Sequence, residues 1–157
     1  MNPLKILSEK EKNEIIEKLN GQFGIKNIPG KIITRGRERL FLYSGNLGDG
    51  QIKKLEEIAF LERVGSYFAK MEESEEQIRL SIEGAQVLQN QITKNIFEIP
   101  EELVEEWMKG NELNIKTELR GFVIIKYKND FLGTGKASEN KISNFIPKNR
   151  RLKEKSN

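Results

Sequence analysis

The residues whose types suggest chemistry lie together in one stretch near the C-terminus, "FLGTGKASENKISNFIPKNRR" at 131–151. Two glycines bracket a threonine in this stretch, and several cationic side chains follow them. These glycines and cations are Gly133, Gly135, Lys136, Lys141, Lys148, Arg150 and Arg151. Glycine within a strand either bends the strand or lets another backbone approach closely, while lysine and arginine neutralise phosphate charge. The spacing leaves two interpretations open, a bent strand or a surface for a nucleic-acid backbone.

The same stretch lacks the motifs of nucleotide-binding enzymes. A dinucleotide fingerprint needs a third glycine and a following helix, and here a strand is expected instead. A P-loop places a serine or threonine after its lysine, whereas Ala137 follows Lys136. No glycine loop of the S-adenosylmethionine type with a downstream acidic residue is present either. We therefore expect no cofactor and no nucleotide hydrolysis.

The composition removes several classes of catalyst. The 157 residues include no cysteine and no histidine, which excludes disulfides, thiolate nucleophiles, a Ser-His-Asp triad and histidine-ligated metals. Carboxylate chemistry remains, and its candidates are Glu72, Glu73 and Glu75 in "EESEE". Such a charge run is typical of a solvated turn, and catalysis would require converging carboxylates with raised pKa values in a deep pocket. We therefore expect a protein that is not an enzyme and holds no metal.

Charge is distributed unevenly along the chain, whose formal net charge is +3. Residues 115–157 contain eleven Lys and Arg against four Asp and Glu, a balance of +7. The chain has 27 basic and 24 acidic residues in all, so the other 114 residues contain 16 and 20, a balance of −4. A basic segment of this kind indicates an anionic partner such as nucleic acid, although basic tails also serve solubility alone.

Neither a membrane span nor a secretion signal is predicted. The sequence has no run of eighteen apolar residues. The N-terminal "MNPLKILSEKEKNE" has only a short apolar core before it turns acidic, unlike a signal peptide. We therefore expect a cytoplasmic protein without a membrane partner.

A helix and a hairpin are predicted at the start of the chain. Ser8 and Glu11 form a capping box, and the helix that follows is expected to end at Asn20–Gly21. The apolar residues of 31–43 predict two strands joined by a tight turn. Three arginines occupy this turn: Arg35, Arg37 and Arg39. Exposed arginines at a hairpin tip are more often solvated than bound, and whether these contact RNA stays open.

Further helices and strands follow in a mixed order, as periodicity and turn residues indicate. Helices are expected over 51–60, over 83–92 and from Pro100, taken as the first helical residue, to Gly110. Strands are expected over 62–72, 76–82, 94–99, 112–116, 121–128, 131–137 and 141–146. Trp107 is expected in the core. The short strands after Gly110, joined by tight turns, predict a small closed β-barrel.

One strand of the predicted barrel is apolar almost throughout. The segment "GFVIIKYK" at 121–128 is a nearly continuous apolar run, as expected of a strand covered on both faces. Lys126 and Lys128 are two positions apart near its end, so alternation would place them on one face. We expect them to extend the phosphate-binding surface.

These residues and motifs also resemble a known RNA-binding family. Residues 95–146 resemble a PUA domain, a small β-barrel found in RNA-modifying enzymes and ribosome-assembly factors. The resemblance is carried by the helix before Gly110–Asn111, by "GFVIIKY" and above all by "FLGTGKA", which is similar to the G-x-G-x-A pattern that ends a strand in the family. It implies RNA binding and no catalytic residue.

The resemblance extends towards the N-terminus. The segment 61–113 is similar to a large-subunit ribosome biogenesis factor family that pairs an α/β N-terminal domain with a C-terminal PUA domain. Gly65, Phe68, Lys70 and Ile82 stand in the matching places. The tail "ISNFIPKNRRL" instead resembles the PUA domains of Nol1/Nop2/Sun RNA cytosine methyltransferases. Since 157 residues leave no room for a methyltransferase domain, we expect a stand-alone relative that works beside such an enzyme.

Together, the patterns and the resemblance predict a two-domain α+β protein. Residues 1–92 are expected to form an N-terminal α/β domain, and residues 93–157 a PUA-like β-barrel with a basic tail. We expect a non-catalytic factor of ribosome biogenesis or of rRNA or tRNA modification, which binds RNA through this barrel. The predicted RNA-binding residues are Lys126, Lys128, Gly133, Gly135, Lys136, Lys141, Lys148, Arg150 and Arg151. The alternative is a protein-interaction subunit that docks an RNA methyltransferase or a ribosome-assembly protein.

Overall fold

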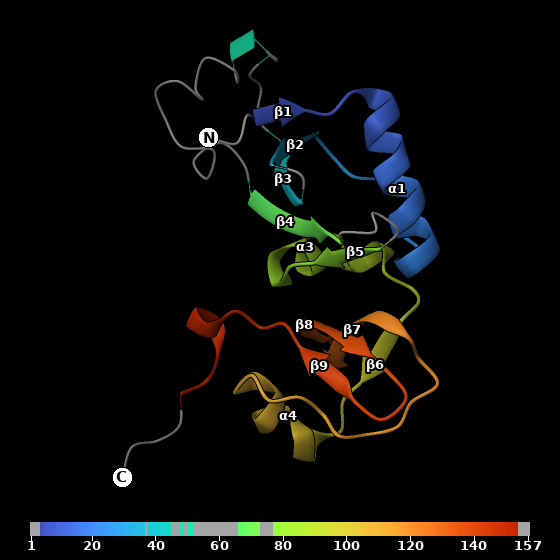
Figure 1. Cartoon of the computed structure of the whole chain (residues 1–157), viewed down its shortest axis with the longest axis vertical. Helices are drawn as coiled ribbons and strands as arrows, with labels where there is room; N and C mark the ends of the chain where they lie inside the picture. The colour runs from blue at the N-terminus through green and yellow to red at the C-terminus, as the bar shows by residue number, and fades with distance from the viewer. Residues whose placement is uncertain are drawn as a thin grey trace.

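The computed structural model describes residues 4–36, 38–44, 48, 50–51, 66–72 and 77–153. Its helices and strands fall into two groups, one above the other in Figure 1. The upper, N-terminal group holds a five-stranded sheet with helices α1 and α3, and the lower, C-terminal group holds a four-stranded sheet with helix α4. This mixture confirms the predicted α+β class. The helix expected over 51–60 and the turn expected at 73–75 lie almost wholly outside the described residues.

The first sheet is antiparallel throughout, and its strands follow one another in chain order from β1 to β5. The strands are β1 (Leu4–Ile6), β2 (Lys31–Arg35), β3 (Arg39–Tyr43), β4 (Ser66–Met71) and β5 (Ile78–Leu80). β2 and β3 pair as the first predicted hairpin, and β4 and β5 pair as the second. Both predicted hairpins are therefore confirmed over the described residues.

Helix α1 (Glu9–Phe23) packs against this sheet. Its predicted start is confirmed: the Ser8 hydroxyl accepts from the Glu11 N–H at 3.2 Å, and the Glu11 carboxylate accepts from the Ser8 N–H at 3.1 Å. Its end differs from the prediction, because the helix continues past Gly21. Gly24 supplies the left-handed conformation, φ 86°, in which helices commonly end. No helix in the described part of the chain is long and apolar enough to cross a membrane.

Helix α3 (Ile82–Val87) and the 3-10 turn η2 (Gln89–Gln91) lie on the side of the N-terminal group that faces the second sheet. They occupy the place of the predicted helix after β5. The Ser81 hydroxyl caps α3 by accepting from the Gly84 N–H at 2.9 Å. Gly84 lies so close to β4 that a Cβ there would come within 2.1 Å of the Phe68 carbonyl oxygen. The missing side chain therefore lets α3 lie directly on the strand.

The second sheet has the strand order β6-β7-β8-β9, with β6 parallel to β7 and the other pairs antiparallel. Its strands are β6 (Ile96–Glu98), β7 (Gly121–Tyr127), β8 (Asp130–Ala137) and β9 (Ile142–Asn144). Helix α4 (Glu101–Met108) lies below this sheet in Figure 1. The 3-10 turn η3 (Lys148–Arg150) follows β9.

Three details of the C-terminal group differ from the predictions. Pro100 is the N-cap of α4 and precedes the helix, because its backbone is extended at ψ 146°. Residues 112–116 contribute one isolated bridge, from Leu113 to Ile142, where a strand was predicted. The strand pairings among the described residues run in an open order from β6 to β9, so they show a small β-sheet without showing the closure of a barrel.

Strand β7 is buried on both faces, as its apolar run predicts. Phe122 and Ile124 join the core that contains α1 and the first sheet. Val123 and Ile125 point the other way, into a core around Trp107 of α4. Each of the four β7 side chains is at most 2% exposed, so each contributes about 1.5–3 kcal/mol through burial. β7 therefore belongs to two cores at once.

A bulge in β8 changes the direction of its side chains. The pairing of β7 with β8 shifts after Ile124, because β8 has one residue more over the same length. Gly133 lies in this interval with φ 104°, a conformation that favours glycine. As a result, Phe131 and Thr134 both face the N-terminal group: Phe131 joins its core, and the Thr134 hydroxyl donates to the Leu80 carbonyl at 2.7 Å. The bent-strand interpretation is confirmed for Gly133.

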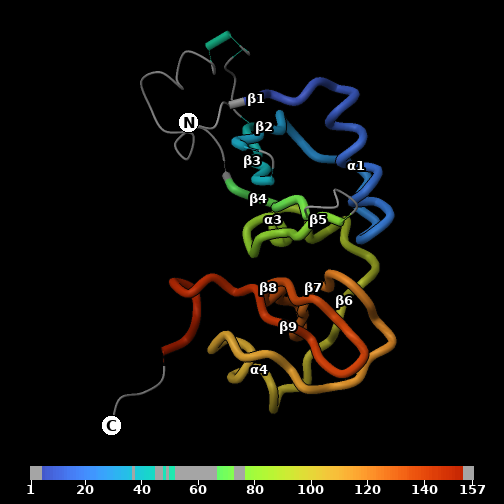
Figure 2. Tube along the Cα trace, viewed as in Figure 1, coloured from blue at the N-terminus to red at the C-terminus, as the bar shows by residue number. Residues whose placement is uncertain are grey.

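The two groups are also tied together along the chain that connects them. The Thr93 N–H donates to the Phe23 carbonyl at 2.8 Å, and the Asn95 side chain donates to the Gln22 carbonyl. The trace in Figure 2 shows α3 and β5 on the side of the N-terminal group that faces the second sheet, and both lie beside β8. The connecting segment is therefore anchored to the end of α1 before it enters the second sheet.

Titration of Glu11 tests the cap of α1. The side-chain hydrogen bond from Lys5, at 2.6 Å, and the backbone hydrogen bond from Ser8 lower the pKa of Glu11 from 4.5 to about 2. We expect an NMR titration to give this value and expect Lys5→Met to raise it. Because the folded pKa is lowered, the ionised carboxylate stabilises the fold above about pH 4.5, and this contribution is lost as the pH falls towards 2. An ordinary Glu11 pKa in the wild type would contradict the cap.

A substitution at Gly135 tests the packing behind β8. A Cβ at this position would lie 2.5 Å from the Ile142 Cγ2 and 2.7 Å from the Ser143 carbonyl oxygen. We expect Gly135→Ala to lower the free energy of unfolding by about 1–3 kcal/mol in urea denaturation. Gly21→Ala is the matched control, because a Cβ there meets nothing within 4 Å and alanine favours a helix by up to about 1 kcal/mol. Equal stability of the two variants would refute the packing role.

Candidate RNA interface

The two glycines predicted to admit RNA lie inside the structure. Both are buried, and their Cβ sides face other side chains of the chain itself. Gly133 lies beside Ile146, and Gly135 lies between Ile142 and Trp107. An RNA backbone has no room on this side of β8. The prediction is therefore corrected: these glycines let β8 bend and pack closely against β9 and α4.

Two of the predicted lysines lie on one face of the second sheet. The Lys136 Nζ is 5.3 Å from the centre of the Phe122 ring and 3.7 Å from the Glu72 carboxylate. Alternation along β7 places Lys126 on the same face as Phe122. Since Phe122 pairs with Lys136, the two lysines are separated by about four residues of strand, roughly 13 Å. The N-terminal group covers the sheet face between them, because Ile124 and Phe131 are buried in its core, so the two lysines lie at opposite ends of a covered face.

Lys128 does not join this pair. It lies after the end of β7, in the turn that leads to β8, with φ 54°. The strand alternation that would place it beside Lys126 stops at Tyr127, so the predicted common face is wrong for this residue. The Lys128 Nζ lies 5.3 Å from the centre of the Tyr127 ring.

Lys141 lies at the opposite end of β8 from Lys128. The turn before β8 holds Lys128, and the turn after β8 holds Lys141. β8 has 8 residues, so the two turns are about 26 Å apart. Lys141 forms an ion pair with Glu112 at 3.2 Å. An RNA that contacts both lysines would have to run along the whole sheet.

The two arginines of the tail are held by the chain itself. Arg150 forms an ion pair with Glu83 of α3. The Arg151 Nε donates to the Ile146 carbonyl at 2.9 Å. The Arg151 side chain also fills the space beside Gly110, where a Cβ would overlap it. Arg151 therefore fastens the tail to the end of α4, and its guanidinium is only partly available to RNA.

The structure thus divides the predicted cations by their surroundings. Lys126 and Lys136 lie on the shared sheet face, and Lys148 is exposed in the 3-10 turn η3. The cations in the turns at either end of β8 are Lys128 and Lys141, and the tethered ones are Arg150 and Arg151. The predicted set does not form one continuous patch. The Arg35–Arg39 loop lies in the N-terminal group, and Arg37 is outside the described residues.

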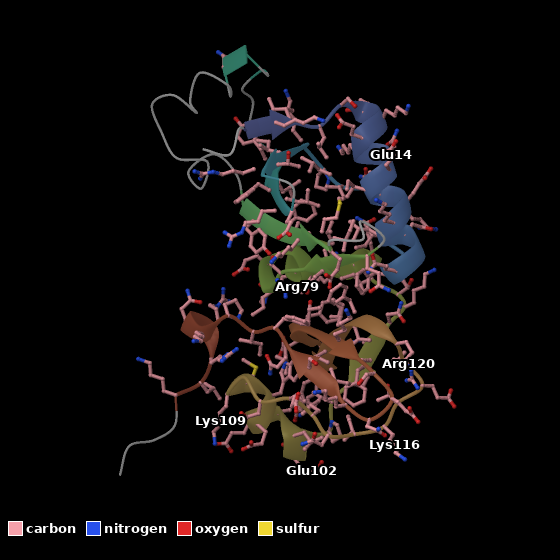
Figure 3. The ribbon with its side chains drawn as sticks, viewed as in Figure 1. Glu14, Arg79, Glu102, Lys109, Lys116 and Arg120 are labelled. Carbon is pink, nitrogen blue, oxygen red and sulfur yellow. The ribbon has the colours of Figure 1, made fainter. Side chains whose placement is uncertain are left out.

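A hollow beside Lys136 contains side chains that the sequence did not reveal as a group. Its volume is about 220 Å³. Its lining is Glu38, Lys70, Met71, Glu72, Arg79, Phe122 and Phe145. Figure 3 labels Arg79 where the N-terminal and C-terminal groups meet. These residues come from five separate segments of the chain, so no local motif could have predicted their neighbourhood.

The arrangement offers binding chemistry. Among the described residues, no group of three or more acidic side chains could hold a metal ion. Glu72, which was weighed as a catalytic carboxylate, is paired with Lys136, and Glu73 and Glu75 lie outside the described residues. Cations and aromatic rings at one surface are the groups with which proteins bind single-stranded nucleic acid.

Comparison with known families identifies the C-terminal part of the chain. Residues 94–152 match the family described as the methyltransferase RsmF PUA domain. This segment is a PUA domain. The expected resemblance to the PUA domains of Nol1/Nop2/Sun methyltransferases is thereby confirmed. No curated protein matches the chain.

The PUA domain contains β6 to β9, α4 and η3, and with them all the predicted RNA-binding residues. The match covers less than half of the chain and leaves the N-terminal group outside it. The division of the chain at residues 92 and 93 stays a prediction. The hollow is lined by residues from both sides of that division.

Two substitutions in the tail of the PUA domain distinguish a structural cation from a surface one. We expect Arg151→Ala to lower the free energy of unfolding by about 1–2 kcal/mol, because the Ile146 carbonyl loses a charged donor. Lys148→Ala should change it by less than about 0.5 kcal/mol, since Lys148 is exposed. Urea denaturation measures both values. If Arg151→Ala were as stable as Lys148→Ala, the tethering role of Arg151 would be wrong.

Proposed function

We propose that the chain is a non-catalytic, cytoplasmic RNA-binding factor of ribosome biogenesis or of rRNA or tRNA modification. In this proposal the PUA domain, as a small β-barrel, contacts the RNA. The N-terminal α/β domain supports it and adds side chains to the edge of the RNA surface.

The observation that carries the proposal is the PUA match at 94–152, because PUA domains are RNA-binding modules. The charge of the chain supports it, since residues 115–157 carry a balance of +7. Lys126, Lys136 and Lys148 provide cations that can neutralise phosphates without disturbing the core.

A salt series measures whether these three lysines bind phosphate. The variant Lys126→Ala/Lys136→Ala/Lys148→Ala is compared with the wild type, using a structured ribosomal RNA fragment and a transfer RNA. Each phosphate contact contributes about 0.7–0.9 to the slope of log affinity against log salt. We therefore expect a steep wild-type slope and a slope that is flatter by about 2–3 in the variant. The RNA that binds better indicates the pathway.

The matched control is Lys10→Ala/Lys18→Ala/Lys26→Ala, which removes the same charge from the N-terminal group. It should keep the wild-type slope, because these lysines lie on or after α1, outside the PUA domain. Binding that is weak and insensitive to salt in all three proteins would contradict the proposal. Equal flattening in both variants would show that only net charge matters.

A second candidate function rests on the dispersal of the cations. Lys128 and Lys141 lie at opposite ends of β8, and Arg150 and Arg151 are held by groups of the chain. Such dispersal favours a protein-interaction subunit that docks an RNA methyltransferase or a ribosome-assembly protein, with RNA contact incidental. A wild-type salt slope near about −1, unchanged in the triple variant, would favour this second function.

A further inference from the structure

The hollow between the first sheet and the PUA domain has two walls of different chemistry. The N-terminal group contributes charged side chains from β4, β5 and the turn before β3. The PUA domain contributes two phenylalanine rings, one from β7 and one just after β9. Charge on one wall and flat apolar surface on the other would suit a planar ligand with polar edges.

Arg79 and the two rings form a stacked arrangement. The Arg79 guanidinium carbon lies 4.3 Å from the centre of the Phe145 ring. Phe145 meets Phe122 edge-on, with ring centres 5.9 Å apart and planes at 66°. Phe122 is buried, whereas Phe145 is partly exposed and faces the hollow. Aromatic rings and guanidinium planes are the surfaces on which proteins stack unpaired bases.

The polar groups around the hollow retain hydrogen-bonding capacity. Glu38 is 3.4 Å from Lys70, and Glu72 is 3.7 Å from Lys136, both distances beyond ordinary hydrogen bonds. The Arg79 side chain forms no ion pair or hydrogen bond with another described residue. A guanidinium has five N–H donors and a carboxylate about four acceptor sites. Donors and acceptors are therefore both available to a ligand.

The size and the charge of the hollow select the class of ligand. Pockets for drug-sized ligands measure about 300–1,000 Å³, so a hollow of about 220 Å³ suits one planar ring system. The Glu38 and Glu72 carboxylates oppose a phosphate group inside it. They would accept from the amino group of adenine, cytosine or guanine, as carboxylates do from cytosine in DNA complexes. Uracil has no such amino group.

We propose that the hollow receives one splayed-out, amino-bearing base of the RNA, stacked on the face of the Arg79 guanidinium that Phe145 does not cover, with its amino group donating to Glu72 or Glu38. This inference rests on the proposed function, because an RNA strand bound at the exposed Lys136 would place one of its bases at the hollow. Lys136 adjoins Phe122 and Glu72 at the edge of the hollow and neutralises the phosphate beside the base. The hollow thus adds base selectivity to binding that is otherwise driven by charge.

The test uses two unstructured RNA probes, an oligouridine and the same oligouridine with one central adenine. We expect the wild type to bind the adenine probe about tenfold more tightly, because adenine can donate its amino group to the carboxylates of the hollow and uracil cannot. Phe145→Leu, Arg79→Lys and the double variant Glu38→Ala/Glu72→Ala, which removes both acceptors, should each reduce this preference to about twofold or less. Arg79→Lys keeps the positive charge but loses the planar group, and Phe145→Leu keeps an apolar side chain.

Matched controls make the same exchanges elsewhere in the PUA domain. Phe97→Leu in β6 and Arg120→Lys before β7 alter residues that do not line the hollow, so both should keep the tenfold preference. Circular dichroism and urea denaturation show whether each variant is folded. Arg79→Lys and Glu38→Ala/Glu72→Ala alter residues at the surface of the hollow and keep the test valid if Phe145→Leu does not fold.

The salt series separates failure of this inference from failure of the proposed function. Loss of the adenine preference in the hollow variants, with an unchanged salt slope for Arg79→Lys and Phe145→Leu, supports the base site. If the wild type has a steep slope but no adenine preference, or if the variants keep the preference, the base site is wrong and RNA binding stands. If the wild type binds neither probe nor the structured RNAs, both are overturned.

Discussion

A strand whose two faces are both apolar needs a packing partner on each face. β7 is such a strand, and the arrangement of the whole protein depends on its two packing partners. The N-terminal group covers Phe122 and Ile124, and α4 with Trp107 covers Val123 and Ile125. Removing either cover would expose two large side chains and cost about 3–6 kcal/mol, a large share of the 5–15 kcal/mol that stabilises a typical domain. The N-terminal and C-terminal groups are therefore coupled through one strand.

The same requirement determines where a binding surface can form. The face of β8 that looks towards the N-terminal group is closed at Thr134, whose hydroxyl is buried and bonded to the Leu80 carbonyl. Two residues further along β8, the N-terminal group no longer covers the strand, and the Lys136 side chain reaches the surface beside Phe122. Cationic and aromatic groups thus meet at the boundary between the packed and the open parts of one sheet face. A polar ligand that binds at this boundary would contact charged side chains while the core stays closed.

Local features of the fold could be predicted from the sequence, whereas features that depend on packing could not. The capping box, both hairpins and the burial of β7 follow from residues close together in the chain. The end of α1 was misplaced because a helix tolerates Gly21 when Gly24 supplies the left-handed turn. The role of Gly135 depends on its approach to Trp107, which is distant in sequence. The hollow around Arg79 has the same origin, since its lining comes together only when the two groups pack.

The parallel pairing of β6 with β7 has a consequence for the order of folding. Ile96 pairs with Ile124, so α4 and a long connection intervene, while β7, β8 and β9 are joined by short turns and can pair locally. During synthesis β6 emerges first and has to wait for its partner. An unpaired strand is a site of misassembly, and short length and charged neighbours limit that hazard. β6 has 3 residues, ends with Glu98 and is preceded by Lys94, which suits a strand that stays an open edge until β7 has been made.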